Sequence, residues 1–122
     1  MTSKGPKSLA EAFPEPTQAD VEAAVDRLVQ AFDPLRIIIF GSYARGNAQP
    51  GSDLDMLVVL STVEDKREAA LAMRRELSGC AVGSDVMVTT PDEIERRGWI
   101  IGTGLREALR EGQVVYESTE AA

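Results

Sequence analysis

The chain has 122 residues, of which 43% are hydrophobic and 27% charged, a size and composition typical of one globular domain. It has no histidine and a single cysteine, Cys80, which excludes a Ser-His-Asp triad, a disulfide framework and a zinc site built from histidines or several cysteines. The formal net charge of −7 argues against a nucleic-acid partner, because the phosphate backbone is itself negative. Any bound metal would have to be held by oxygen atoms.

Three segments are expected along the chain. Residues 1–16 are rich in proline and polar side chains and are predicted to form a flexible arm. Residues 17–117 form the folded domain, and residues 118–122 form a frayed tail. No apolar run approaches the ~18 residues of a membrane span, and the N-terminus lacks the apolar stretch of a secretory signal. We therefore expect no membrane partner and, by default, a cytoplasmic location.

Hydrophobic periodicity and capping residues predict the elements of this domain in chain order. They are a helix over 18–32, a strand over 35–40, a helical turn over 43–47, a strand over 53–60, a helix over 63–77, a strand over 84–89, helices over 91–97 and 101–111, and a short edge strand over 114–116. The loop between the first two strands is too short for a parallel crossover, so part of the sheet should be antiparallel. The fold class is α/β, a small mixed sheet flanked by helices.

Gly41 and Ser42 follow the first predicted strand and precede a helical turn. A glycine lets the backbone approach a ligand closely, and the free N–H groups at the start of a helix attract an anion. Together with the Ser42 hydroxyl, this arrangement suits a phosphate. A Gly-Ser pair taken alone is far more often an ordinary turn.

Asp53 and Asp55 are two residues apart in a predicted strand, so their carboxylates should project on the same side. Adjacent carboxylates repel each other, and a hard divalent cation such as Mg²⁺ would reverse that effect. Asp85 opens the third strand and could join them if that strand lies beside the second. As isolated residues, these aspartates are as readily read as a loop cap and solvated surface acids.

The combined pattern resembles a known family. The run Phe40-Gly41-Ser42-Tyr43-Ala44-Arg45-Gly46 followed by Gly51-Ser52-Asp53-Leu54-Asp55 is similar to the signature of polymerase-β-type nucleotidyltransferases, in particular the minimal nucleotidyltransferases. Asp85 stands where that family has its third carboxylate, and the resemblance covers about residues 20–117. The N-terminal arm, residues 1–16, has no recognised counterpart in that family.

The resemblance implies a function and a set of site residues. It implies the transfer of AMP from ATP to a tyrosine hydroxyl of a helical HEPN-type toxin, with this chain acting as the antitoxin. Asp53, Asp55 and Asp85 would be the catalytic carboxylates and would hold two Mg²⁺ ions. Gly41, Ser42 and Arg45 would bind the nucleoside triphosphate. The oligomeric state is left open, a homo-oligomer included.

Several alternatives stay open at this point. The chain could be an antitoxin that neutralises its toxin by binding alone, or a transferase for a small molecule such as an aminoglycoside. Arg45 could equally form a surface ion pair, and Tyr43 is more simply a packing residue. Because the chain is too short for a second substrate-binding domain, we expect a protein acceptor and an exposed apolar patch on a helix face near residues 99–109.

Overall fold

The computed structural model describes residues 15–119. Its elements are α2 (Gln18–Phe32), β1 (Arg36–Phe40), α3 (Ser42–Arg45), β2 (Leu54–Val59), α4 (Lys66–Leu77), β3 (Ser84–Thr89), α5 (Pro91–Arg97), α6 (Gly104–Glu111) and β4 (Gln113–Glu117). The predicted arm lies outside the described residues except for positions 15 and 16, and so does the predicted tail beyond residue 119.

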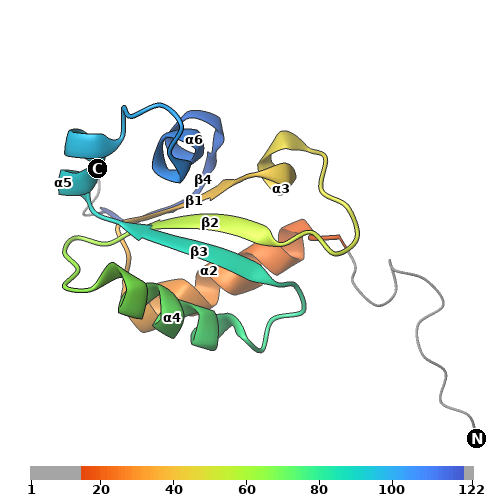
Figure 1. Cartoon of the computed structure of the whole chain (residues 1–122). Helices are drawn as coiled ribbons and strands as arrows, with labels where there is room; N and C mark the ends of the chain where they lie inside the picture. Colours follow the sequence, from red (N-terminus) through yellow and green to blue (C-terminus); the bar gives the residue numbers. More distant parts are fainter. Residues whose placement is uncertain (1–14, 120–122) are drawn as a thin grey trace, which may run out of the picture.

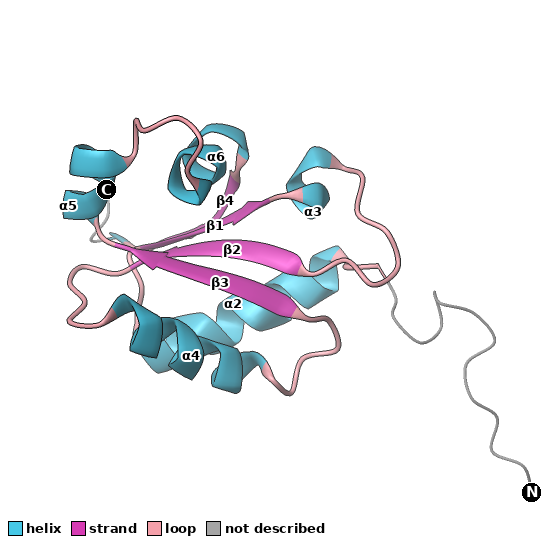
Figure 2. Cartoon of the chain, viewed as in Figure 1, coloured by secondary structure: helices cyan, strands magenta, loops and turns pink. Residues whose placement is uncertain are grey.

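The four strands form one mixed sheet in the order β3-β2-β1-β4. β1 is antiparallel to both of its neighbours, and β2 and β3 are parallel. Helices α2 and α4 cover one face of the sheet, and α3, α5 and α6 lie on the other side (Figures 1 and 2). The predicted mixed sheet flanked by helices is therefore confirmed.

Alternation along the strands divides the core into two layers. The larger layer lies under α2 and α4 and includes Ile37, Ile39, Met56 and Val58. The smaller one lies under α6, where Ala108 packs against strand residues that are one position out of phase, such as Ile38 and Leu57. Because both faces are covered, β1 and β2 are nearly continuous apolar runs.

Local capping determines where the helices begin. The predicted cap of α2 is present as a reciprocal pair: the Asp20 N–H donates to the Thr17 hydroxyl, and the Thr17 N–H donates to the Asp20 carboxylate. The predicted start of a helix at residue 63 was wrong, because Asp65 caps α4 by accepting from the N–H groups of Arg67 and Glu68.

The last helix and strand also differ from their predicted bounds. α6 begins at Gly104 and not at residue 101, since the Thr103 hydroxyl accepts from the Arg106 N–H and caps it there. β4 extends over Gln113–Glu117, and the Ser118 N–H still donates to the Leu35 carbonyl. None of the helices in the described range is long and apolar enough to cross a membrane.

Candidate active site

The turn after β1 brings backbone directly against a carboxylate. Gly41 caps α3 with φ of +77° and ψ of −153°, a conformation that favours glycine strongly. A side chain at this position would overlap the carboxylate of Asp55, the residue that pairs across the sheet with Phe40. Gly41 is therefore required here both for its backbone conformation and for its lack of a Cβ atom.

Asp55 and Asp85 occupy matching positions on the two parallel strands. They are Cα partners in the β2–β3 register, and the residues two positions further on, Leu57 and Met87, both contact the layer under α6. The two aspartates therefore project from the α6 side of the sheet, and Leu54 is buried on the other side. The structure thus brings the second and third predicted carboxylates next to each other.

Asp53 precedes β2 by one residue and is exposed. Its carboxylate lies so close to Gly83 that a side chain at residue 83 would overlap it. The Gly83 carbonyl accepts from the Leu54 N–H at 2.9 Å, which ties the start of β2 to the turn before β3. Asp53 therefore lies at the same end of the sheet as Asp55 and Asp85, where β2 and β3 begin and beside the turn that leads into β3. We call this end of the sheet the carboxylate edge.

The electrostatics of this edge are dominated by negative charge. Partial burial raises the pKa of the Asp55 carboxyl, and the charges of Asp85, Asp53 and Glu107 raise it further. Arg45 opposes them but does not compensate fully, so the pKa of Asp55 remains above its ordinary value. An additional positive charge would relieve this repulsion.

One cation already contacts the group. The Arg74 guanidinium donates to the Asp85 carboxylate at 3.1 Å. Arg74 belongs to α4, which packs on the opposite face of the sheet, so its side chain reaches Asp85 around the edge strand β3. Within residues 15–119 no three acidic or cysteine side chains are gathered closely enough to hold a metal ion, so the three aspartates share an edge without converging on one point.

The predicted nucleotide-binding residues are adjacent to the carboxylates but differ in their contacts. Ser42 is half-buried at the start of α3. The Arg45 side chain lies 3.8 Å from Glu107 and 3.7 Å from Glu111, both on α6. Sequence reasoning considered a surface ion pair for Arg45, but it did not identify Glu107 or Arg74 as neighbours of the site. Their positions depend on how α6 and α4 pack, which no local motif indicates.

The donor atoms at this edge are of the kind that Mg²⁺ binds, although the three side chains are not gathered around one point. All the available ligands are carboxylate oxygens, which are hard donors of the kind that Mg²⁺ prefers. Burial is the largest cause of the raised pKa of Asp55, and the charges of Asp85, Asp53 and Glu107 add to it, so a cation near these carboxylates would be favourable. Arg74 would compete with the ion for Asp85, since its guanidinium pairs with one oxygen of that carboxylate.

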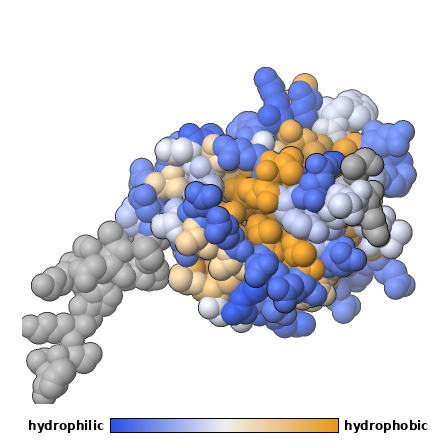
Figure 3. All heavy atoms as spheres, turned by 180° about the vertical axis from the view of Figure 1, so that it is seen from behind, coloured by the Kyte–Doolittle hydropathy of each residue, from blue (hydrophilic) through white to orange (hydrophobic). Residues whose placement is uncertain are grey.

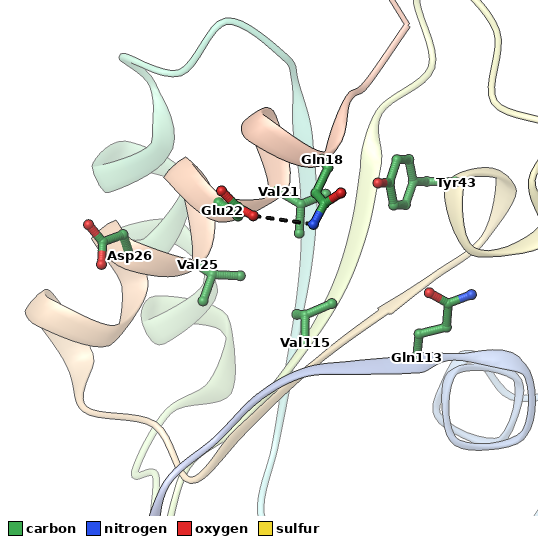
Figure 4. Close-up of a pocket in the computed structure, with 8 residues that line it drawn as sticks. All are labelled: Gln18, Val21, Glu22, Val25, Asp26, Tyr43, Gln113 and Val115. Carbon is green, nitrogen blue, oxygen red and sulfur yellow. Dashed lines mark hydrogen bonds between the residues drawn. The ribbon is translucent and has the colours of Figure 1, made fainter.

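A concave region lies on the other face of the sheet, between α2 and β4. It has a volume of about 570 Å³, and Val21, Val25, Tyr43 and Val115 supply its apolar surface (Figure 4). Tyr43 also packs against the larger core layer, in agreement with a packing role. This groove is on the side of the sheet opposite to Asp55.

Two exposed apolar residues lie in the region that the sequence predicted, residues 99–109, but they are not on a helix. Trp99 and Ile101 are 68% and 83% exposed, but they belong to the loop between α5 and α6. The apolar residues of α6 itself, Leu105, Ala108 and Leu109, pack against the sheet. The expectation of an apolar patch on the helix face was therefore wrong, because the smaller core layer uses that face.

Comparison with known proteins adds independent findings. The family model described as a nucleotidyltransferase domain matches residues 21–116. No curated protein is significantly similar to the chain. A candidate nucleotidyltransferase from Sulfolobus solfataricus has a similar structure, with 20% identity and a TM-score of 0.57 over 81% of this chain and 78% of the other.

Two solved toxin–antitoxin structures are also similar. A mutant of the MntA-HpeT toxin–antitoxin has 19% identity and a TM-score of 0.55, covering 82% of this chain and 74% of the other. A toxin–antitoxin with AMP-PNP has 20% identity and a TM-score of 0.50, covering 81% and 75%. At these identities the similarity concerns the fold.

Proposed function

Because the chain belongs to the nucleotidyltransferase domain family, we propose that it transfers AMP from ATP, with Mg²⁺, to a tyrosine hydroxyl of a HEPN-type toxin and acts as its antitoxin. The fold is the polymerase-β-type nucleotidyltransferase fold, a mixed four-stranded sheet flanked by helices. The observation that carries the proposal is the contact between the Gly41 turn and Asp55, with Asp85 beside it on the parallel strand.

The residues of the turn and of the strands have distinct parts in this reaction. The hydroxyl oxygen attacks the α-phosphorus of ATP, the bond to the β-phosphate oxygen breaks, and pyrophosphate leaves. The N–H groups at the start of α3 and the Ser42 hydroxyl bind the departing phosphates. Asp85 accepts the proton of the attacking hydroxyl. Arg45 joins the phosphates by leaving its two ion pairs with α6, which are long and half-exposed.

Asp53, Asp55 and Asp85 are the residues that would hold Mg²⁺. Bound there, the metal would neutralise triphosphate charge and favour ionisation of the acceptor hydroxyl. The carboxylates supply negative charge, which adds to the effect of burial in raising the pKa of Asp55 and makes the binding of a cation favourable.

A protein acceptor is supported by the described fold and by the structural neighbours of the chain. The folded part consists of one sheet with its helices, with no second domain among the described residues to bind an acceptor. Two structural neighbours are toxin–antitoxin proteins, and one of these was solved with AMP-PNP. These similarities support a toxin partner and an adenine nucleotide as donor.

The test is transfer of label from α-³²P-ATP to a purified HEPN-type protein encoded beside this chain's gene. We expect Mg²⁺-dependent label on the toxin, with transfer reduced at least about 100-fold in Asp53→Asn, as for removal of a catalytic electrostatic group. Asp92→Asn is the matched control, because Asp92 is exposed on α5 and forms an i,i+4 ion pair with Arg96. Equal labelling by wild type and Asp53→Asn would contradict the proposed site.

A binding-only antitoxin is the second candidate, favoured by one observation. The three aspartates do not converge within residues 15–119, and Asp85 is already paired with Arg74. In this case the chain and its Asp53→Asn variant would suppress the toxin equally well, without labelling it. Titration with Mg²⁺ and ATP separates the two, since a nucleotide at about 100 times its dissociation constant stabilises a binding protein by ~2.7 kcal/mol.

A further inference from the structure

β4 is the strand with the least cover from helices. It is at one edge of the sheet and pairs only with β1. The extensive helix contacts of the sheet are those of α4 with β3, of α6 with β1 and β2, and of α3 with β1 and β2. Val114 and Val115 are consequently 55% and 36% exposed. Seen from behind, the molecule shows a continuous apolar area bordered by hydrophilic residues (Figure 3).

The groove beside β4 lies on the face of the sheet that α2 and α4 cover. A third helix in that layer would fill it. Val115 points from β4 toward α2, and Val21 and Val25 of α2 form the opposite side (Figure 4). Tyr43 lies at the α3 end of the groove. Apolar side chains at helical spacing could therefore pack between α2 and β4 as ridges between existing elements.

Among the described residues, the charged side chains that line the groove are both acidic. Glu22 and Asp26 line it, and its other polar residues are the neutral amides Gln18 and Gln113. The one cation of α2, Arg27, is directed elsewhere, since its guanidinium donates to the Glu76 carbonyl on α4 at 3.1 Å. A basic partner would complement this surface, and a second copy of the chain would bring like charges together.

The geometry of β4 disfavours the addition of another strand. The β1–β4 register shifts between Ile37 and Ile38, where Val115 is the extra residue on β4. A bulge interrupts the regular ladder and is a common way to protect an edge from strand pairing. A partner is therefore expected to bind as a helix in the groove and not as a strand added to β4.

We propose that the groove between α2 and β4 binds a basic amphipathic helix of a partner protein, with apolar side chains between Val25 and Val115 and lysine or arginine beside Glu22 and Asp26. This surface is on the opposite face from Asp55 and does not require the nucleotide reaction. A partner held there leaves the carboxylate edge free.

The test uses the whole chain and a defined probe. The probe is a fluorescent, helix-forming peptide of about 14 residues with leucines at i, i+3, i+4 and i+7 and lysines on both sides of them. A scrambled peptide of the same composition and a peptide with glutamate in place of lysine are the peptide controls. Anisotropy measures affinity, and amide chemical shifts locate the binding site, both without nucleotide or metal.

We expect saturable binding of the lysine peptide with shifts confined to α2, β4 and α3. Val115→Asp should weaken it roughly tenfold by placing a charge in the apolar contact. Glu22→Lys with Asp26→Lys should also weaken it and reduce its salt dependence. The control Glu64→Lys with Glu95→Lys makes the same change in net charge on exposed residues outside the groove and should bind normally.

Three results would overturn the proposal: equal binding of the scrambled or glutamate peptide, shifts outside the groove, or an unchanged affinity in both groove variants. Self-association through β4, detected by sedimentation without peptide, would also replace it. Because Val115→Asp could perturb folding, the doubly charge-reversed variant tests the site independently. The Asp53→Asn chain should bind the peptide normally, which distinguishes failure of this surface from failure of the proposed transferase activity.

Discussion

Two carboxylates near opposite ends of the parallel strand pair have contrasting environments. Asp55 lies where β2 and β3 begin, and Glu93 contacts Thr89, where β3 ends. Burial raises the pKa of Glu93, but hydrogen bonds from Lys66 and Thr89 outweigh burial and lower it overall. Burial also raises the pKa of Asp55, and there the surrounding carboxylates add to the effect.

Glu93 stabilises the folded state, whereas the ionised carboxylate of Asp55 destabilises it. The Glu93 carboxylate accepts from the Lys66 ammonium at 2.5 Å and from the Thr89 hydroxyl at 2.6 Å, and so joins the starts of α4 and α5 to β3. Asp55 has negative neighbours, and Arg45 compensates only in part. Uncompensated acids of this kind are typical of a site that a ligand completes.

The largest change in stability is expected from removing the charge of Glu93. Glu93→Gln should lower the free energy of unfolding by about 1 kcal/mol at neutral pH, because it removes a charged partner of Lys66 and Thr89. Since the pKa of Glu93 is lowered by folding, its contribution is complete above its unfolded pKa of about 4.5 and is lost as the pH falls through the folded value.

Urea unfolding at a series of pH values measures this contribution. The loss of stability on acidification should be smaller in Glu93→Gln than in the wild type. Glu95→Gln, an exposed neighbour on α5, serves as the control and should behave like the wild type. An equal change in stability in Glu95→Gln and Glu93→Gln would show that the contacts of Glu93 with Lys66 and Thr89 do not stabilise the fold.

Removing the charge of Asp55 is expected to have a smaller effect on stability, and one of opposite sign. Because folding raises the pKa of Asp55, its ionised form opposes folding, and this cost increases as the pH rises through the folded value. Asp55→Asn should therefore leave stability at neutral pH unchanged or slightly increased, within about 1 kcal/mol. Thermal melts with and without Mg²⁺ check this: the metal should stabilise the wild type and not Asp55→Asn.

The smallest effect is expected from the ion pair at Asp85. Arg74→Ala removes the cation that competes with Mg²⁺ for this carboxylate, so Mg²⁺ affinity should rise about two- to fivefold, as expected for an exposed pair worth ~0.5–1 kcal/mol. Arg75→Ala is the matched control on the same helix. Calorimetric titration with Mg²⁺ measures both variants, and an unchanged or lower affinity in Arg74→Ala would show that Arg74 does not compete with the metal.

Elements with their signals in adjacent residues were predicted accurately. α2 has its capping pair at Thr17 and Asp20, and α5 has Thr90 before Pro91, so both helices begin and end as expected. α4 and α6 were extended too far toward the N-terminus, because the true caps, Asp65 and Thr103, lie within the predicted helices. Periodicity indicates that a helix exists but does not identify its first residue.

The sequence by itself determined the order of the elements, the alternation of the strands and therefore the common side of Asp55 and Leu57. These are properties of residues that are neighbours along the chain. Only the tertiary structure decided that Asp85 lies beside Asp55, that Arg74 reaches it around β3, and that β4 has less cover from helices than the other strands. Such contacts depend on how helices and strands distant in sequence pack together, and no local pattern encodes that packing.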